Sequence, residues 1–154
     1  MVNVSLAGAV ASAVVARLDL QPHPEGGWYK ESWRGSAERE GERGTGTTIL
    51  FLLDEGQRSR WHRIDATEIW FYHAGAALRL FTASSEQTGG IREHRLGPDV
   101  LAGDEVQYVI PPGEWQSAHA VEGWSLVSCV VVPAFEFSGF ELAEKGWQPE
   151  SNVE

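Results

Sequence analysis

Residues 59–75, SRWHRIDATEIWFYHAG, contain the pattern from which the architecture and the chemistry of this chain are predicted. The stretch sets His62 and Glu68 six positions apart in an apolar, aromatic-rich run. Side chains alternate between the two faces of a strand, so Glu68 shares a face with Trp70 and Tyr72 if no bulge intervenes. If this face and that of His62 both turn inward, the imidazole and the carboxylate meet in a cavity walled by the two aromatic side chains.

Length and composition predict one globular domain. The chain has 154 residues, and we expect a single domain over residues 1–154 because that length supports one core. Hydrophobic residues make up 42% of the chain and include seven tryptophans, which excludes a disordered chain. The formal net charge is −10 and the basic residues are scattered, which argues against nucleic acid as a partner.

Cysteine content and hydropathy bear on the compartment. A single cysteine, Cys129, rules out an internal disulfide and suits a reducing compartment, so we expect a cytoplasmic protein. No apolar run approaches the roughly 18 residues that a membrane-spanning helix needs. The sequence therefore predicts no membrane partner.

The periodicity predicts a short N-terminal helix followed by many short strands. Apolar residues within positions 1–18 recur near helical spacing, which favours an amphipathic helix. TTILFLL, residues 47–53, is typical of a buried strand. Further short apolar runs, separated by turn residues, lie around position 61 and at 69–71, 78–81, 91–96, 106–110 and 124–132. This arrangement predicts an all-β sandwich or small barrel, with core packing as the expected role of Phe135, Phe137 and Phe140.

Two motifs carry a resemblance to a known superfamily. Residues 56–75 resemble the first motif of the cupin superfamily, G-x5-H-x-H-x3-E-x6-G. Every fixed position matches except one, because Ile64 stands in the place of the second histidine. The second cupin motif centres on P-x-G-x2-H, and PPGEWQ, residues 111–116, matches its proline and glycine. Gln116 stands where its histidine belongs.

The resemblance extends over residues 18–142 and implies more than a fold. Longer segments are similar to a cupin-like domain of unknown function related to sugar-nucleotide epimerases of the dTDP-4-dehydrorhamnose type. The resemblance implies a double-stranded β-helix, the jelly-roll barrel of cupins, with a ligand cavity inside the barrel and a homodimer. It leaves the reaction open, because cupins include isomerases, metal oxygenases and binding proteins, and fold does not carry function.

Three functions remain open for the predicted cavity. In the first, His62 is a general base, Glu68 orients it and Tyr72 is the complementary acid, as in the metal-independent epimerases that the branch resembles. In the second, His62, Glu68 and Gln116 bind a divalent metal, although Gln116 is a poor ligand and Ile64 can donate nothing. In the third, the cavity binds a small polar molecule without turnover.

The predicted ligand contacts surround these residues and fit a sugar-like or nucleotide-linked molecule. Trp70 and Trp61 would stack on apolar ring faces, while Gln116 and Gln107 would hydrogen-bond hydroxyl groups without contributing charge.

Residues 22–31, PHPEGGWYKE, combine paired glycines with four ionisable side chains. Paired glycines permit positive φ or a close approach of the backbone. One interpretation is that His23 and its neighbours reach the cavity mouth, where Lys30 or Arg34 holds an anionic group. The other is that the segment forms a capping turn whose charges face solvent.

Overall fold

The computed structural model describes residues 2–86 and 89–150 of the chain. The predicted single domain, 1–154, also includes residues 1, 87–88 and 151–154, which lie outside the described residues. Two short 3-10 helices cover Val100–Ala102 and Phe137–Gly139. The other elements, in chain order, are α1 (Val2–Leu18), β1 (Gln21–Pro22), β2 (Trp28–Arg34), β3 (Thr47–Leu53), β4 (Arg58–Ile64), β5 (Thr67–Gly75), β6 (Leu78–Ala83), β7 (Arg92–Leu96), β8 (Gln107–Ile110), β9 (Trp115–His119), β10 (Ser125–Val132) and β11 (Phe140–Leu142).

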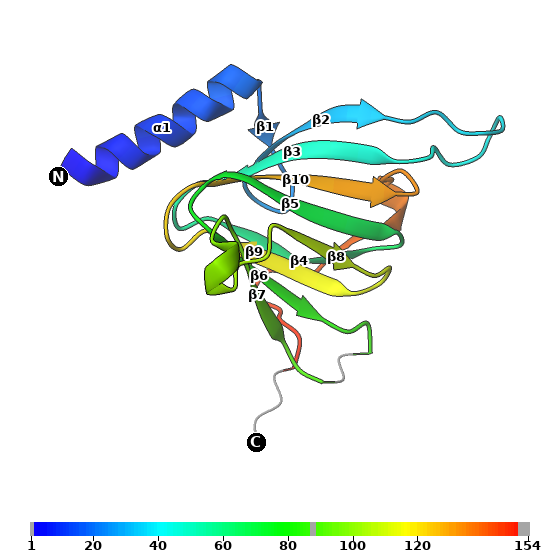
Figure 1. Cartoon of the computed structure of the whole chain (residues 1–154). Helices are drawn as coiled ribbons and strands as arrows, with labels where there is room; N and C mark the ends of the chain where they lie inside the picture. The colour runs from blue at the N-terminus through cyan, green and yellow to red at the C-terminus, as the bar shows by residue number, and fades with distance from the viewer. Residues whose placement is uncertain (1, 87–88, 151–154) are drawn as a thin grey trace.

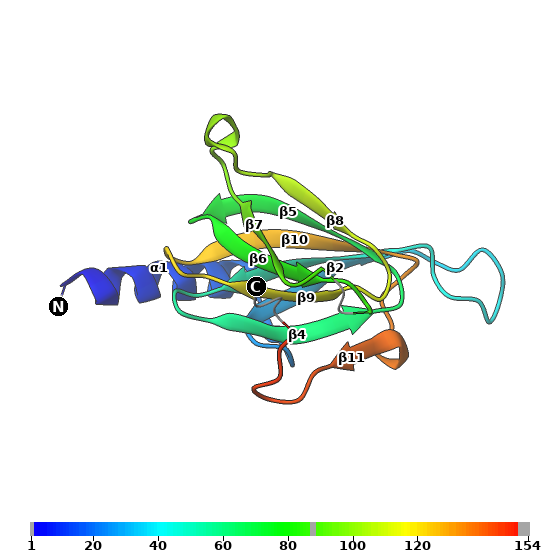
Figure 2. The same ribbon diagram turned by 90° about the horizontal axis from the view of Figure 1, so that it is seen from below.

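Two antiparallel sheets face each other and enclose the core (Figures 1 and 2). The larger sheet has the order β1-β2-β3-β10-β5-β8, and the smaller has the order β11-β4-β9-β6-β7. Strands that are distant in sequence, such as β3 and β10, are therefore neighbours in space. This arrangement confirms the predicted all-β jelly-roll barrel.

The pattern of buried residues along each strand explains why some strands were predictable from the sequence and β9 was not. In β10 buried and partly buried residues alternate over seven positions, as expected for a strand with one face on the core. The first four residues of β9 are all buried instead, because Trp147 and Ala143 pack on Trp115 from outside the sheet. The missing alternation is why β9 was not predicted.

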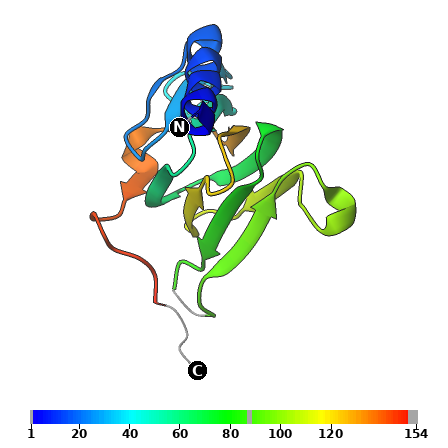
Figure 3. The ribbon, with the colours of Figure 1, turned by 90° about the vertical axis from the view of Figure 1, so that its left-hand side faces the viewer.

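The C-terminal half of helix α1 packs against the larger sheet. Ala11 is 2% exposed and packs with Leu20 and Leu52, and Val14 joins the same cluster. Figure 3 shows the helix at the side of β2 and β3, away from β6 and β7. The predicted N-terminal helix is confirmed, but it is only weakly amphipathic, since Val10 is exposed while Ala11 is buried. No helix in the described part of the chain is both long and apolar enough to cross a bilayer.

Candidate functional site

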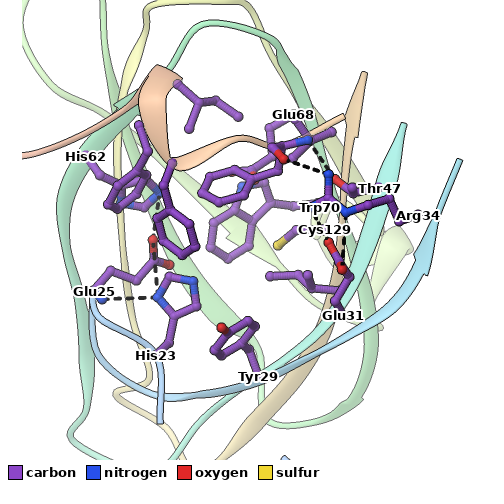
Figure 4. A pocket seen from close by; sticks show the side chains of 16 residues that line it. His23, Glu25, Tyr29, Glu31, Arg34, Thr47, His62, Glu68, Trp70 and Cys129 are labelled. Carbon is purple, nitrogen blue, oxygen red and sulfur yellow. Dashed lines mark hydrogen bonds and ion pairs between the residues drawn. The ribbon is translucent and has the colours of Figure 1, made fainter. Parts of the chain in front are cut away.

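A cavity of about 160 Å³ lies between the two sheets (Figure 4). Its lining comes from the 22–27 turn, from strands β2, β3, β4, β5 and β10, and from the segment 135–140. In Figure 4, His62, Glu25 and His23 lie together on one wall, and Arg34 with Glu31 lies on the other. The cavity is thus the barrel interior that the resemblance implied.

The glycine pair places Glu25 in the cavity. The backbone N–H of Arg60, in β4, donates to the carbonyl oxygen of Glu25 at 2.7 Å, so the turn is fastened to the strand. Gly26 has a φ of +109°, and a Cβ there would lie 2.3 Å from the carbonyl oxygen of Arg58. Only glycine permits this approach without displacing backbone. The side chain of Glu25 consequently points inward, where the residue is 6% exposed.

His62 and Glu25 form a buried pair. The Nδ1–H of His62 donates to the carbonyl oxygen of Arg60 at 2.7 Å, so Nε2 carries no proton in the neutral ring. Nε2 lies 3.2 Å from Oε2 of Glu25. Burial lowers the pKa of His62 to about 4. Burial, and to a lesser extent the nearby carboxyl of Glu68, raises the pKa of Glu25 well above its usual value. Burial therefore favours the neutral imidazole and the neutral carboxyl over their charged forms.

This pairing corrects a prediction. Glu68 was expected to orient His62, and both do line the cavity, but the carboxyl in contact with the imidazole belongs to Glu25. The sequence interval of six residues links motif positions on β4 and β5. It carries no information about the turn at 22–27, which comes earlier in the chain and contacts β4 only in the folded structure.

His23 extends the pair on the same wall. The backbone N–H of Glu25 donates to its Nδ1 at 3.1 Å, so the proton of the neutral ring is on Nε2. Burial, with a smaller effect of His62, lowers the pKa of His23 to about 4. The ring packs edge-to-face on Tyr29, with ring centroids 4.5 Å apart. Both cavity imidazoles are therefore neutral at neutral pH.

Glu68 is a second buried carboxyl on the cavity wall. It is 7% exposed, and burial raises its pKa to about 7 even though the Gln116 amide and the Trp70 indole counteract part of this effect. Gln116 itself is fully buried beneath the lining, where its Oε1 accepts the indole N–H of Trp70 at 2.8 Å. Trp70 lines the cavity as predicted, whereas Gln116 supports it from behind.

The cavity lining also includes an ion pair, opposite His62 in Figure 4, and three phenylalanine rings. Nη2 of Arg34 lies 2.6 Å from Oε1 of Glu31, and Nη1 donates to the carbonyl oxygen of Phe135 at 3.1 Å. Arg34 is the only lysine or arginine that lines the cavity within the described parts of the chain. Phe135, Phe137 and Phe140 all line the cavity, so their role goes beyond the predicted core packing. Pairing of β11 with β4 holds Phe140 beside His62, with ring centroids 5.6 Å apart.

Four predicted site residues lie away from the cavity, for geometric reasons. Tyr72 is four residues beyond Glu68, about 13 Å along the strand, and its hydroxyl donates to a backbone carbonyl at 2.6 Å. Trp61 precedes His62 and so faces outward, where it packs beside Ala83 and Trp115.

Lys30 and Gln107 are the other two corrections. Lys30 is exposed on β2, where it alternates with the cavity residues Tyr29 and Glu31, and its Nζ lies 3.6 Å from Oδ2 of Asp19. Gln107 is exposed at the start of the edge strand β8.

Several cavity residues escaped the sequence reasoning. Glu25 is one of the four ionisable side chains of residues 22–31, and its place before two glycines is the only signal in the sequence for its inward position. Tyr29 and Glu31 flank Lys30 on one strand, so their side chains must point to the face opposite Lys30, and this was predictable from the sequence. Cys129 lies opposite Trp70 in the register of β10 and β5, a pairing that no local pattern reveals.

The donor set does not fit the metal site that was considered. Oε1 of Gln116 is engaged by Trp70, Ile64 contributes only an aliphatic side chain, and Nδ1 of His23 accepts the amide of Glu25. Within residues 2–86 and 89–150, no three His, Cys, Asp or Glu side chains are arranged to hold a metal ion. A catalytic zinc or iron normally takes three good protein ligands.

The barrel, its interior cavity and the two motif regions define a cupin-type protein. Residues 12–143 match the family described as Cupin superfamily (DUF985), and the chain belongs to that family. A hypothetical protein from Leishmania major is similar, with 33% identity over 85% of each chain and a TM-score of 0.77. A protein from Shewanella oneidensis shows 36% identity over 86% of this chain and 84% of its own, with a TM-score of 0.80.

A more distant structural match supports the fold alone. Oxalate decarboxylase from Bacillus subtilis has a TM-score of 0.61 at 15% identity, over 81% of this chain and 30% of the decarboxylase. No curated protein sequence matched this chain significantly.

Proposed function

We propose that this protein binds a small polar molecule in the barrel cavity and moves a proton on it without a metal, as isomerases and epimerases do. The observation that carries the proposal is the buried contact between Nε2 of His62 and Oε2 of Glu25. Two groups that share one proton in a cavity can accept or release it at little cost. The resemblance of longer sequence segments to cupins related to sugar-nucleotide epimerases supports this class of reaction by analogy.

Glu25 is the group of the pair that meets the ligand. Its Oε2 faces His62, so Oε1 is the oxygen available to a substrate. When the shared proton moves to Nε2, Glu25 becomes a carboxylate beside an imidazolium. That carboxylate takes a proton from a carbon next to a substrate carbonyl, and the C–H electron pair moves into the carbonyl to form an enolate. His62 thus acts through Glu25 as a positioning residue and a charge partner.

Glu68 supplies the return proton. Its pKa of about 7 leaves roughly half of the molecules protonated at neutral pH, which suits a general acid. Transfer of this proton to the other face of the same carbon completes an epimerisation, and the electron pair of the enolate re-forms the carbonyl. After this step the His62–Glu25 pair holds one proton more than at the start, and Glu68 holds one fewer. Proton exchange with water returns all three side chains to their original protonation states.

Hydrogen–deuterium exchange tests the proposal. Small hydroxy-, oxo- and amino-carbonyl compounds are first ranked by thermal shift, because a ligand at a hundred times its dissociation constant adds about 2.7 kcal/mol of stability. Each compound that binds is then incubated with the protein in D₂O and chelator, and NMR follows the loss of the C–H signal. We expect exchange in at least one binder and at least a hundredfold slower exchange in Glu25→Gln.

Two further measurements separate this proposal from its alternatives. His62→Asn should keep ligand affinity within about tenfold while exchange is lost, since it removes the charge partner but keeps a polar side chain. If no binder exchanges, the protein is a binding protein and the proposal is rejected. Elemental analysis of protein purified without chelator tests the metal alternative: one equivalent of a transition metal, lost in His62→Ala, would overturn metal independence.

A further inference from the structure

We infer that the ligand of this cavity is a small organic cation, such as an ammonium or amidinium compound, and not a sugar nucleotide or another phosphate. The inference rests on the proposed function, because it names the substrate class for the same cavity. It starts from the charges and ring systems of the lining residues.

The lining contains three carboxyl groups, one guanidinium and two imidazoles. Glu25 and Glu68 are buried in it, while the guanidinium of Arg34 is already engaged by both carboxylate oxygens of Glu31 and by a backbone carbonyl. The two cavity imidazoles are neutral, as their hydrogen bonds and burial indicate. Two interior carboxyls are therefore left without a cation from the protein. A bound cation would stabilise the ionised form of Glu68, whose pKa is about 7, whereas a phosphate would add a second negative charge beside it at low dielectric.

Aromatic side chains line the same cavity as these carboxyls. Phe135 packs edge-to-face on Phe137 and on Phe140, with centroid distances of 5.0 and 5.7 Å. Tyr29 and Trp70 line the same cavity. Rings in differing orientations offer π faces to a cation, and such contacts contribute about 0.5–2 kcal/mol each.

The rim also has an uncovered aromatic surface. Phe137 lines the cavity and is still 60% exposed, so the rim has apolar surface that a ligand can cover. Aromatic walls alone would also suit a sugar. Combined with two carboxyls that lack a protein cation, they favour a positively charged group.

Cavity size points the same way. A volume of about 160 Å³ is close to that of an engineered cavity that holds benzene, so roughly six to ten non-hydrogen atoms fit inside. A sugar nucleotide is several times larger, and its pyrophosphate would have to pass the Arg34–Glu31 pair at the rim. Lys30, expected at this rim, faces the other side of β2.

Three matched pairs of compounds test ligand charge at nearly constant shape. They are choline with 3,3-dimethylbutan-1-ol, benzylamine with benzyl alcohol, and benzamidine with benzamide, and inorganic phosphate serves as the anionic probe. Thermal shift at pH 8 followed by titration calorimetry gives the affinities. We expect the cation of at least one pair to bind tenfold or more tightly than its neutral partner, and phosphate to bind no better than the neutral compounds.

Two variants locate the effect. Glu68→Gln should reduce the preference for the cation at least fivefold while leaving the affinity for the neutral partner nearly unchanged. Glu93→Gln, which removes an exposed carboxylate on β7, should leave the preference as it is. Because a cation favours the ionised form of Glu68, its affinity should also rise between pH 6 and pH 8.

Failure of this inference is distinguishable from failure of the proposed function. The inference is overturned if no cation in the panel binds better than its neutral partner, or if Glu68→Gln leaves the preference intact. Cation-selective binding without deuterium exchange in any binder would reject proton transfer and keep the cation site. Deuterium exchange on a neutral carbonyl compound, with no preference for cations, would reject the cation site and keep proton transfer.

Discussion

Replacing Glu68 with glutamine is expected to stabilise the protein by about 3 kcal/mol at pH 8 and by only about 1 kcal/mol at pH 5. The pKa of this carboxyl is raised by burial from 4.5 in a free chain to about 7 in the folded protein. Between these two values the unfolded chain has released the proton while the folded chain still holds it. Stability therefore falls as the pH rises through this interval, and the full cost is present above pH 7.

The magnitude follows from the difference between the two pKa values. A shift of one unit corresponds to 1.36 kcal/mol, so about 2.5 units give a cost of about 3 kcal/mol once the folded carboxyl is ionised. Glutamine has nearly the same shape and carries no charge at any pH. Any effect of the amide on packing is the same at pH 5 and at pH 8, so the difference of about 2 kcal/mol between the two pH values isolates the ionisation.

Urea unfolding followed by tryptophan fluorescence at pH 5 and pH 8 measures this difference, at one protein concentration so that association adds no separate effect. Glu93→Gln is the matched control. Glu93 pairs with Arg79 on the surface, and the guanidinium lowers its pKa, so this carboxylate is ionised at both pH values and its loss should cost the same at each. An equal effect of Glu68→Gln at the two pH values would refute the reasoning.

Three further predictions concern the His62–Glu25 pair, the turn at 22–27 and Tyr72. The ring signals of His62 should titrate in NMR with a midpoint near pH 4, and a midpoint near 6.5 would contradict a buried neutral imidazole. Gly26→Ala should lower the free energy of unfolding by at least about 2 kcal/mol more than Gly41→Ala. Both glycines have positive φ, but only at Gly26 would the new Cβ meet the carbonyl oxygen of Arg58, so equal losses would contradict the close approach. Tyr72→Phe should leave cation affinity within about twofold in calorimetry, because its hydroxyl binds a backbone carbonyl away from the cavity, and a tenfold loss would contradict this placement.

The fold was predictable because its signals are local. Alternating burial in β10 reveals a strand with one face on the core, and the run of β-branched and apolar residues in β3 reveals a strand whose end is buried on both faces. The spacing within residues 56–75 then identifies the superfamily and hence the barrel. β9 lacked such a signal, since residues after position 140 cover its outer face. Contacts formed by a distant segment remove the alternation that sequence reasoning uses.

The site was only partly predictable, for the same physical reason. Alternation correctly placed His62, Glu68 and Trp70 on the cavity wall. It could not identify Glu25 as the partner of His62, because that contact depends on a turn lying against β4. Proximity in sequence also misled the prediction for Trp61, since adjacent strand residues face opposite sides.

The replaced motif positions explain why the cavity should select an organic cation. In the cupin motif a carboxylate stands with histidines, a donor set that suits a metal cation. Here Glu68 is retained, but Ile64 and Gln116 stand where histidines belong, and Gln116 is turned to Trp70. A carboxyl kept in a buried position without those donors costs stability whenever it ionises. Glu68 is useful in this position if a bound ligand offsets the free-energy cost of ionising it. A positively charged ligand does so directly, because it stabilises the ionised carboxylate.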